Sequence, residues 1–316
     1  MKDIIAPVPK ELLKAELTED KRLRFTRRSD NEIYVVTAHE APNVMREIGR
    51  LREIAFRAAG GGTGKDVDID EYDTMEVPYK QLIVWNPENY DIIGGYRFIY
   101  GSDMRYDENG MPMIATAHGM FRFSDKFMKD YLPYTVELGR AFVALEYQST
   151  RMGSKSLFAL DNLWDGLGAL AVVLPGMKYY FGKVTMYPSY PIDARNVILY
   201  FLREQFPDKD KLVEPIEPLG PGGDETAFKS LFCYDNYKDN YYALKQEVQK
   251  SGVTIPPMVS AYMGLSATMR IFGTAINYGF GNVEETGLLI AVDELLEEKR
   301  KRYIESFINS NPDAVK

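Results

Sequence analysis

Hydrophobic residues along the chain switch between the spacing of a strand and that of a helix. Residues 31–38 combine β-branched and aromatic side chains, which favours a strand. From Pro42 onward, Val44, Ile48 and Ala55 fall on one helical face and predict a helix. The same patterns predict strands at 81–85, 91–100, 178–187, 269–277 and 287–293, and helices at 9–19, 124–131, 156–173, 193–206, 228–250, 255–265 and 294–307. Their order predicts a mixed α/β (α+β) fold in which a twisted sheet of about six or seven strands is flanked by helices.

The predicted elements group into four parts of the chain. Residues 1–30 contain a helix and a basic arm, and residues 31–206 form the core. Residues 207–252 are rich in proline, glycine and tyrosine, which suggests an insertion that acts as a lid. Residues 253–308 supply the strands and the charged helix that complete the core.

One strand in the middle of the chain carries charges where apolar residues are expected. It begins near Tyr134 and leads through a polar loop into a helix, whose N-terminus is suited to bind an anion. Within this strand Glu137 and Arg140 flank Gly139. Side chains alternate between the faces of a strand, so the two charges would point apart unless an extra residue intervenes. The sequence therefore predicts a bulge at Gly139 that brings the charges together, and a sheet that splays after this strand.

Two interpretations of the charged pair are open. A buried ion pair that fixes strand register is a common structural feature. A catalytic pair would use Glu137 to accept a proton from an amine and Arg140 to hold the amine or a carboxylate. The catalytic interpretation is favoured because other predicted elements carry polar residues that a structural pair would not need, namely Arg52, Asp70, Asp73 and Arg97.

Composition narrows the class of protein. The chain has 316 residues, of which 45% are hydrophobic, enough for a substantial core. Its net charge of −8 argues against nucleic-acid binding, and no apolar run approaches the about 20 residues that cross a membrane. The single cysteine, Cys233, favours a reducing compartment, so the cytoplasm is expected. With only His39 and His118 and no HExxH motif, no metal site is expected, and His118 is interpreted as a core or edge residue.

Six short motifs, in chain order, resemble one acyltransferase family. They are Leu51-Arg52-Glu-Ile-Ala-Phe56, Asp70-Glu-Tyr-Asp73, Ile93-Gly-Gly-Tyr-Arg97, Glu137-Leu-Gly-Arg140, Leu163-Trp164 and Ile255-Pro-Pro. Together with the polar loop at 148–153, they resemble the GNAT acyl-CoA N-acyltransferase fold. The chain looks most like the hemolysin-like branch, which contains the N-acyltransferases of ornithine-lipid and glycine-lipid synthesis. It is also similar to the related acyl-homoserine-lactone synthases.

The resemblance implies three groups of site residues. Glu137 and Arg140 would be catalytic. The substrate would be bound by Arg52, Phe56, Asp70, Asp73 and Arg97. The acyl donor and its phosphopantetheine arm would be bound by Phe142, Val143, Gln148, Arg151, Gly153, Ser154 and Lys155. Acyl transfer to an amine requires a neutral amine, a polarised thioester carbonyl and an anchored arm, and these residue types can supply all three.

Two departures from the family pattern bear on the acyl donor. Ala141-Phe142-Val143 stands where the family has Ser-Cys-Val, and Gly153 is followed by Ser154 and Lys155 instead of further glycines. Both favour an acyl-carrier-protein thioester over acyl-CoA as the co-substrate, and no other cofactor is expected. The acidic carrier would dock on a basic surface drawn from Arg22 to Arg28, Lys126, Lys129, Arg151 and Lys155.

The resemblance implies an N-acyltransferase of aminolipid synthesis. It would move a (3-hydroxy)fatty acyl group from acyl carrier protein to the α-amine of glycine or ornithine, and peripheral contact with the inner membrane is left open. One alternative is an acyl-homoserine-lactone-type signal synthase, which would release a free lactone. Another is a non-catalytic, hemolysin-like lipid- or membrane-binding protein. The charged strand and the lack of a long apolar segment argue against that second alternative.

Overall fold

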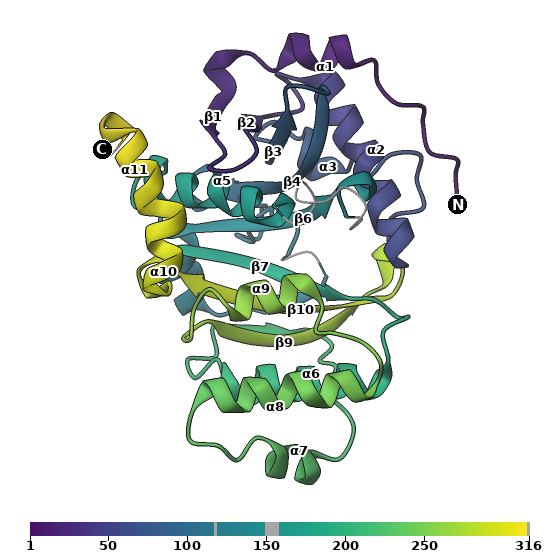
Figure 1. The fold of residues 1–316 in the computed structure, drawn as a ribbon, viewed down its shortest axis with the longest axis vertical. Helices are drawn as coiled ribbons and strands as arrows, with labels where there is room; N and C mark the ends of the chain where they lie inside the picture. The colour runs from purple at the N-terminus through teal and green to yellow at the C-terminus, as the bar shows by residue number, and fades with distance from the viewer. Residues whose placement is uncertain (117–118, 149–157, 315–316) are drawn as a thin grey trace. The chain divides into compact units, whose positions relative to one another are not determined.

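Strands and helices follow each other along the chain as the hydrophobic pattern predicts, which confirms the mixed α/β class (Figure 1). The computed structural model describes residues 1–116, 119–148 and 158–314. The chain divides into two compact units. Unit 1 comprises Met1–Ala115, Leu132–Lys178 and Glu297–Lys316, and unit 2 comprises Thr116–Tyr131 and Tyr179–Leu296.

Unit 1 is built on antiparallel strands. In spatial order they are β1 (Arg22–Phe25), β2 (Glu32–Val36), β3 (Lys80–Asn86), β4 (Asp91–Tyr100) and β6 (Thr135–Val143). The predicted antiparallel hairpin is confirmed as β3 and β4. Both of these strands are buried along nearly their whole length, and most of their side chains are apolar.

The basic run near the N-terminus is not the solvated arm that its charge suggests. Residues 22–25 form the edge strand β1, and Arg24 is buried. Its guanidinium donates hydrogen bonds to the carbonyl oxygens of Asp165 (3.1 Å) and Tyr303 (3.4 Å). Arg27 forms an ion pair with the carboxylate of Asp165 at 3.0 Å. The run therefore joins separate segments of unit 1, because burying an arginine requires partners for its donors.

The helices of unit 1 begin and end where the local sequence favours it. α2 (Pro42–Ala59) has proline in its first turn and ends at Gly60, whose φ of +97° is left-handed. α5 (Ala159–Val173) approaches β3 closely at Gly166, where a Cβ atom would lie 2.8 Å from Leu82. The other helices are α1 (Lys10–Glu16), α3 (Glu71–Thr74), α10 (Glu297–Arg300) and α11 (Ser306–Ser310).

Unit 2 has its own antiparallel strands. β10 (Val283–Ala291) pairs with β7 (Tyr179–Met186) and with β9 (Arg270–Asn277), and it begins four residues before the predicted strand at 287. A smaller pair joins β5 (Phe121–Phe123) to β8 (Val213–Pro215). Neighbouring rings in the core have centroids 5.0 to 6.2 Å apart, and they belong to Phe123, Phe127, Phe181 and Phe272.

The predicted helical segment at 228–250 is divided in two. α7 (Glu225–Leu231) and α8 (Tyr237–Lys250) each begin at a capping side chain, Asp224 and Asn236. α8 packs against α6 (Ile192–Gln205) with Leu244 and Val248 buried, and α9 (Pro257–Met263) follows in the chain. The segment 207–252 thus contributes apolar side chains to the core of unit 2. Its role as a lid stays a prediction.

Gly101 follows β4 at a close contact between backbones. A Cβ atom there would lie 2.0 Å from the carbonyl oxygen of Leu132 and 2.7 Å from the carbonyl carbon of Pro133. Because backbone cannot yield as a side-chain end can, Gly101→Ala is expected to lower the free energy of unfolding by about 1–3 kcal/mol. Urea denaturation measures this loss.

Gly220→Ala is the matched control, since no atom lies within 4 Å of the position of its Cβ. This change is expected to alter stability by no more than about 0.5 kcal/mol. Equal losses in the two variants would show that the contact at Gly101 costs nothing.

Candidate active site

A buried arginine on α2 begins the site. The side chain of Arg52 is fully buried, and its guanidinium lies 3.3 Å from both carboxylate oxygens of Asp73 on α3. It also donates a hydrogen bond to the side-chain oxygen of Gln81 on β3, while the Gln81 amide nitrogen donates to Asp73 at 3.0 Å. Each of these three side chains is thus hydrogen-bonded to the other two, and together they join α2, α3 and β3.

Arg97 on β4 extends this hydrogen-bonded group to Asp70. Its guanidinium lies 2.8 Å from the Asp70 carboxylate and 3.3 Å from that of Asp73. The two aspartates also start α3 as a capping box, in which Asp70 accepts a hydrogen bond from the Tyr72 amide and Asp73 accepts one from the Asp70 amide. The three-residue spacing of the aspartates therefore serves helix initiation and ion pairing together.

The predicted bulge is present in β6. On β4, Gly95 and Arg97 are two residues apart, whereas their partners on β6, Phe142 and Gly139, are three apart. The extra residue places Arg140 at a φ of +48°, in the left-handed region that residues other than glycine seldom adopt. From Gly139 onward β6 is only partly buried, so the bulge marks the point where the strand becomes accessible.

Arg140 is ion-paired with the acidic segment that precedes α3. Its Nε atom lies 2.8 Å from the carboxylate of Asp68, and a terminal nitrogen lies 3.6 Å from that of Asp70. Asp68 is buried and was not among the predicted site residues. The sequence could have indicated Asp68 as a site residue, because it lies two residues before Asp70 and alternate residues of an extended segment share a face.

Glu137 lies on β6 with 1% of its surface exposed. Strand register aligns Gln81, Arg97 and Gly139 in one row across three strands, and alternation puts Glu137 on the same face as that row. Burial, and after it the charge of this carboxylate, raise the pKa of Tyr79 well above its usual value. Glu137 is thus a buried acid beside the bulge, on the face of the sheet that carries Arg97.

The charges of the cluster change one another's proton affinity. Burial acts to raise the pKa of Asp73, but Arg52 and Arg97 outweigh it and hold that pKa at about 2. Burial lowers the pKa of Arg52, which Asp73 only partly offsets. For Arg97, burial is outweighed by Asp73 and Asp70, and its pKa is raised. Asp73 and Arg97 are therefore charged at neutral pH.

The predicted donor residues lie at the accessible end of β6. Phe142 is buried, and its backbone oxygen would lie only 2.5 Å from a Cβ atom at Gly94, so β4 and β6 approach closely there. Gln148 donates a hydrogen bond from its amide to the Val143 carbonyl oxygen at 2.6 Å. Phe56, which was predicted to bind the substrate, is buried on α2. The other predicted positions lie outside the described residues, namely Arg151, Gly153, Ser154 and Lys155, and His118 does as well.

Most of the described residues of the expected docking surface are engaged within the chain. Arg24 is buried and cannot contribute to a surface, and Arg27 is paired with Asp165. Lys126 forms an ion pair with Asp210 at 2.9 Å. The docking surface stays a prediction at Lys129, which is exposed, and at the positions outside the described residues.

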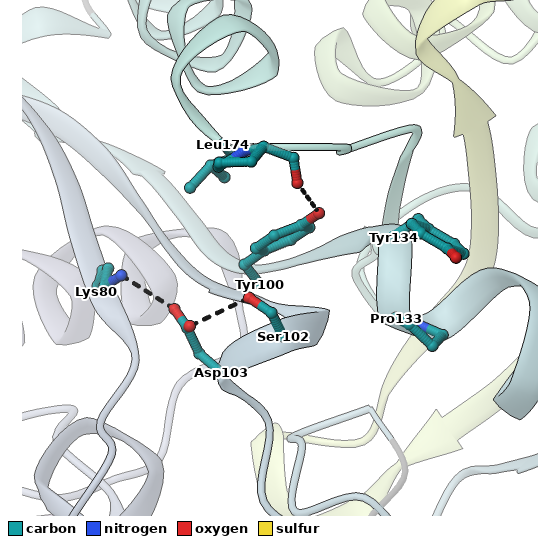
Figure 2. Close-up of a pocket in the computed structure, with 8 residues that line it drawn as sticks. Lys80, Tyr100, Ser102, Asp103, Pro133, Tyr134 and Leu174 are labelled. Carbon is teal, nitrogen blue, oxygen red and sulfur yellow. Dashed lines mark hydrogen bonds and ion pairs between the residues drawn. The ribbon is translucent and has the colours of Figure 1, made fainter. Parts of the chain in front are cut away.

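Figure 2 shows a pocket of about 420 Å³ in unit 1 that none of the predicted site residues lines. The Tyr100 hydroxyl donates a hydrogen bond to the Pro175 carbonyl oxygen at 2.7 Å, and Lys80 is paired with Asp103 at 3.1 Å. The rest of the lining is Ser102, Pro133, Tyr134 and Leu174. These contacts join the end of β4 to the turn after α5.

Comparison with known proteins places these observations in a family. A model described as an acetyltransferase (GNAT) domain matches residues 51–156. Curated glycine N(alpha)-acyltransferases of Phocaeicola vulgatus and Bacteroides thetaiotaomicron are each 66% identical over 316 residues, which is 100% of this chain and 97% and 94% of theirs.

Solved structures give a much weaker likeness. A CoA-dependent acyl-homoserine lactone synthase, BjaI, was determined with MTA and with SAM and isopentyl-CoA. The match covers 89% of each chain at 10% and 11% identity with a TM-score of 0.37, and it adds nothing to the assignment. Identity along the whole chain decides the family: the chain is an N-acyltransferase that belongs to the family of these two relatives, and its residues 51–156 match the GNAT acetyltransferase domain.

Proposed function

We propose that this N-acyltransferase moves a (3-hydroxy)fatty acyl group from an acyl-carrier-protein thioester to the α-amine of glycine, as a step of aminolipid synthesis. The names of the two relatives favour glycine over ornithine as the acceptor. A carrier-protein donor rests on the sequence departures at Ala141 and Ser154.

The observation that carries the proposal is the buried carboxylate of Glu137 beside the bulge of β6. An amine attacks a thioester only when it is neutral, so a base must take its proton. In the proposed step the amine nitrogen bonds to the thioester carbonyl carbon and Glu137 receives the amine proton. The carbon–sulfur bond then breaks, and the proton leaves with the thiol.

The bulge can serve the developing oxyanion. Two residues of β6, Arg140 and Ala141, face the single residue Tyr96 of β4, so their backbone is not held in a regular ladder. Backbone N–H groups aimed at the thioester oxygen would stabilise the charge that forms on it. The guanidinium of Arg140, which is partly exposed beside its ion pair with Asp68, would hold the acceptor's carboxylate, because arginine binds carboxylates with a planar fork of donors.

A substrate panel tests the proposal. Purified protein is incubated with acyl-carrier-protein and CoA thioesters of the same 3-hydroxyacyl and unsubstituted acyl chains, each with glycine, ornithine or serine. Mass spectrometry then identifies the products. The proposal expects N-acylglycine from the carrier-protein thioester. Acylornithine as the main product would reject the acceptor, equal use of CoA would reject the donor, and a free lactone would reject the reaction.

Reversal of two basic charges tests carrier-protein docking. The double change Arg151→Glu and Lys155→Glu is expected to raise the apparent KM for the carrier-protein thioester about tenfold, because each close surface ion pair contributes up to about 1 kcal/mol. The effect should weaken as salt screens the charges. Steady-state kinetics at low and high salt measure both effects.

The matched control reverses Lys229 and Lys238, two exposed lysines of α7 and α8. It should leave the KM unchanged. A KM that responds equally to both pairs would indicate that total charge matters and that docking at Arg151 and Lys155 is wrong.

We also propose a cytoplasmic enzyme that contacts the inner membrane peripherally. The single cysteine and a lipid-like product support this. Among the helices of the described ranges, none has both the length and the apolar character needed to cross a membrane.

A further inference from the structure

Glu53 on α2 has no role in the chemistry described so far, although its side chain is fully buried. Four donors surround its carboxylate. One oxygen accepts hydrogen bonds from the Arg57 Nε atom and the Gly64 amide, each at 2.7 Å. The other oxygen accepts them from the amide (3.1 Å) and the hydroxyl (2.8 Å) of Thr63. Because a carboxylate has about four acceptor positions, those of Glu53 are all used within the chain.

The loop that Glu53 binds depends on such contacts for its order. Residues 61–70 join α2 to α3 without forming a helix or a strand, and Gly62 and Gly64 have left-handed φ values of +97° and +74°. Backbone rich in glycine loses much conformational entropy when it is fixed, so contacts must hold it. A Cβ atom at Gly62 would lie 3.2 Å from both the Glu53 carboxylate and the Arg57 side chain. Loop 61–70 therefore lies directly against this ion pair.

Arg57 and α2 hold the loop at further points. The Arg57 guanidinium donates hydrogen bonds to the carbonyl oxygens of Lys2, at 2.7 Å, and of Lys65. The Asp68 amide donates to the carbonyl oxygen of Gly49 on α2 at 3.0 Å. Loop 61–70 is therefore attached to α2 at several points up to and including Asp68.

Asp68 connects this loop to the proposed acceptor site within unit 1. It is 1% exposed, and its carboxylate lies 2.8 Å from the Nε atom of Arg140. Asp70, two residues later, lies 3.6 Å from a terminal nitrogen of the same guanidinium. The arginine side chain is long and has many rotamers, so the charges that it pairs with help to set where it points. The position of the Arg140 guanidinium thus depends on the position of the loop.

We propose that Glu53 is a positioning residue for the acceptor. By fixing loop 61–70 it holds Asp68, and through Asp68 it holds the guanidinium of Arg140 where the acceptor's carboxylate binds. This inference rests on the proposed function, in which Arg140 binds that carboxylate. Glu53 does not itself bind a substrate, because its acceptor positions are used within the chain. Its effect should therefore be on the binding of glycine and not on that of the acyl thioester.

Glu53→Gln tests this proposal. Glutamine keeps the shape of the side chain, but its NH₂ group would face two donors, and the charge that pairs with Arg57 is lost. Because a displacement of about 1 Å can cost about a hundredfold, kcat/KM for glycine is expected to fall about ten- to a hundredfold, mainly through a higher KM. The apparent KM for the acyl-carrier-protein thioester should not change. Steady-state kinetics with each substrate varied in turn measure both, and an unchanged KM for glycine in the folded variant would overturn the proposal.

Glu47→Gln is the matched control on the same helix. Glu47 is also buried, is paired with Arg50 at 2.6 Å and accepts a hydrogen bond from the Val8 amide at 3.0 Å, and these partners lie outside loop 61–70. Its replacement should lower the melting temperature, as Glu53→Gln does, and leave the KM for glycine unchanged. An equal rise of this KM in both variants would mean that lost stability causes the effect and that the positioning role is wrong.

Thr63→Val is a milder variant that decides the matter if Glu53→Gln does not fold. Valine keeps the shape of threonine and removes one of the four hydrogen bonds to Glu53. The KM for glycine is expected to rise about two- to tenfold, which is the change that one ordinary hydrogen bond supports. A KM equal to that of the unchanged protein would overturn the proposal.

A double-mutant cycle separates this inference from the proposed function. If Glu53 acts through Asp68, Glu53→Gln should raise the KM for glycine little further in the Asp68→Asn background. Additive increases would reject the coupling. If Arg140→Gln leaves the KM for glycine unchanged, the proposed role of Arg140 is itself wrong. If Arg140→Gln raises this KM and Glu53→Gln does not, only the inference about Glu53 is overturned.

Discussion

Glu137→Gln is expected to reduce turnover by about 10²- to 10⁴-fold while the protein stays folded. Glutamine has nearly the same shape as glutamate, but its amide cannot accept the proton of the attacking amine. The alternative interpretation, a structural ion pair, expects a loss of stability of about 3 kcal/mol or more with normal turnover of the folded fraction. Melting temperature and single-turnover rate, measured on one preparation, distinguish the two.

Glu285→Gln is the control for a buried strand carboxylate without a proposed catalytic role. Glu285 on β10 is buried and lies 2.5 Å from the ammonium of Lys183. Its replacement should lower the melting temperature and spare the single-turnover rate. If the two glutamine variants behave alike, the catalytic interpretation of Glu137 has no support.

Asp73→Asn is expected to have the largest effect on stability, a loss of about 3–5 kcal/mol. The side chain of Asp73 is fully buried between the guanidinium groups of Arg52 and Arg97, and Arg52 is itself fully buried. Without the carboxylate these guanidinium groups keep their burial but lose a counter-charge. Urea denaturation at neutral pH measures the loss.

Acid should remove the same contribution from the unchanged protein. Burial alone would raise the pKa of Asp73, but Arg52 and Arg97 lower it from 3.8 to about 2. A carboxyl whose pKa is lower in the folded state stabilises the fold above its unfolded pKa. That stabilisation is lost as pH falls from about 4 toward 2. The stability difference between the unchanged protein and Asp73→Asn should therefore shrink over this range.

Asp103→Asn is the control for Asp73→Asn, because it removes a carboxylate from an exposed ion pair. Asp103 and Lys80 have side chains 35% and 39% exposed, so water already solvates both charges. The substitution should cost less than about 1 kcal/mol. A loss as large as that of Asp73→Asn would contradict the argument from burial.

The elements with strong local signals could be predicted from the sequence. Pro42 and Gly60 mark the ends of α2, and the turn between β3 and β4 marks a hairpin, because these signals act over a few residues. The bulge of β6 was also predictable, since a glycine inside a strand often marks a bulge and this one lies between two charged residues.

Contacts between distant segments could not be predicted in the same way. Charge alone suggested that Arg140 would meet Glu137 and that Arg24 would face water, whereas Arg140 is paired with Asp68 and Arg24 is buried. Such choices depend on which segments the fold brings together. Gln81 could have been predicted as a site residue, because it is polar and lies at the start of the apolar run of β3. Its hydrogen-bond partners Arg52 and Asp73 could not, because tertiary packing brings them to it.

The capping box of α3 limits how the site can change by mutation. Asp70 and Asp73 each accept a backbone hydrogen bond that starts the helix and also bind an arginine of the cluster. Asparagine could keep the cap but not the charge, and glutamate could keep the charge but would displace it by one methylene group. Each position must therefore both cap the helix and pair with an arginine, and a substitution that keeps one of these functions loses the other. Helix geometry therefore restricts both aspartates in addition to the chemistry of the site.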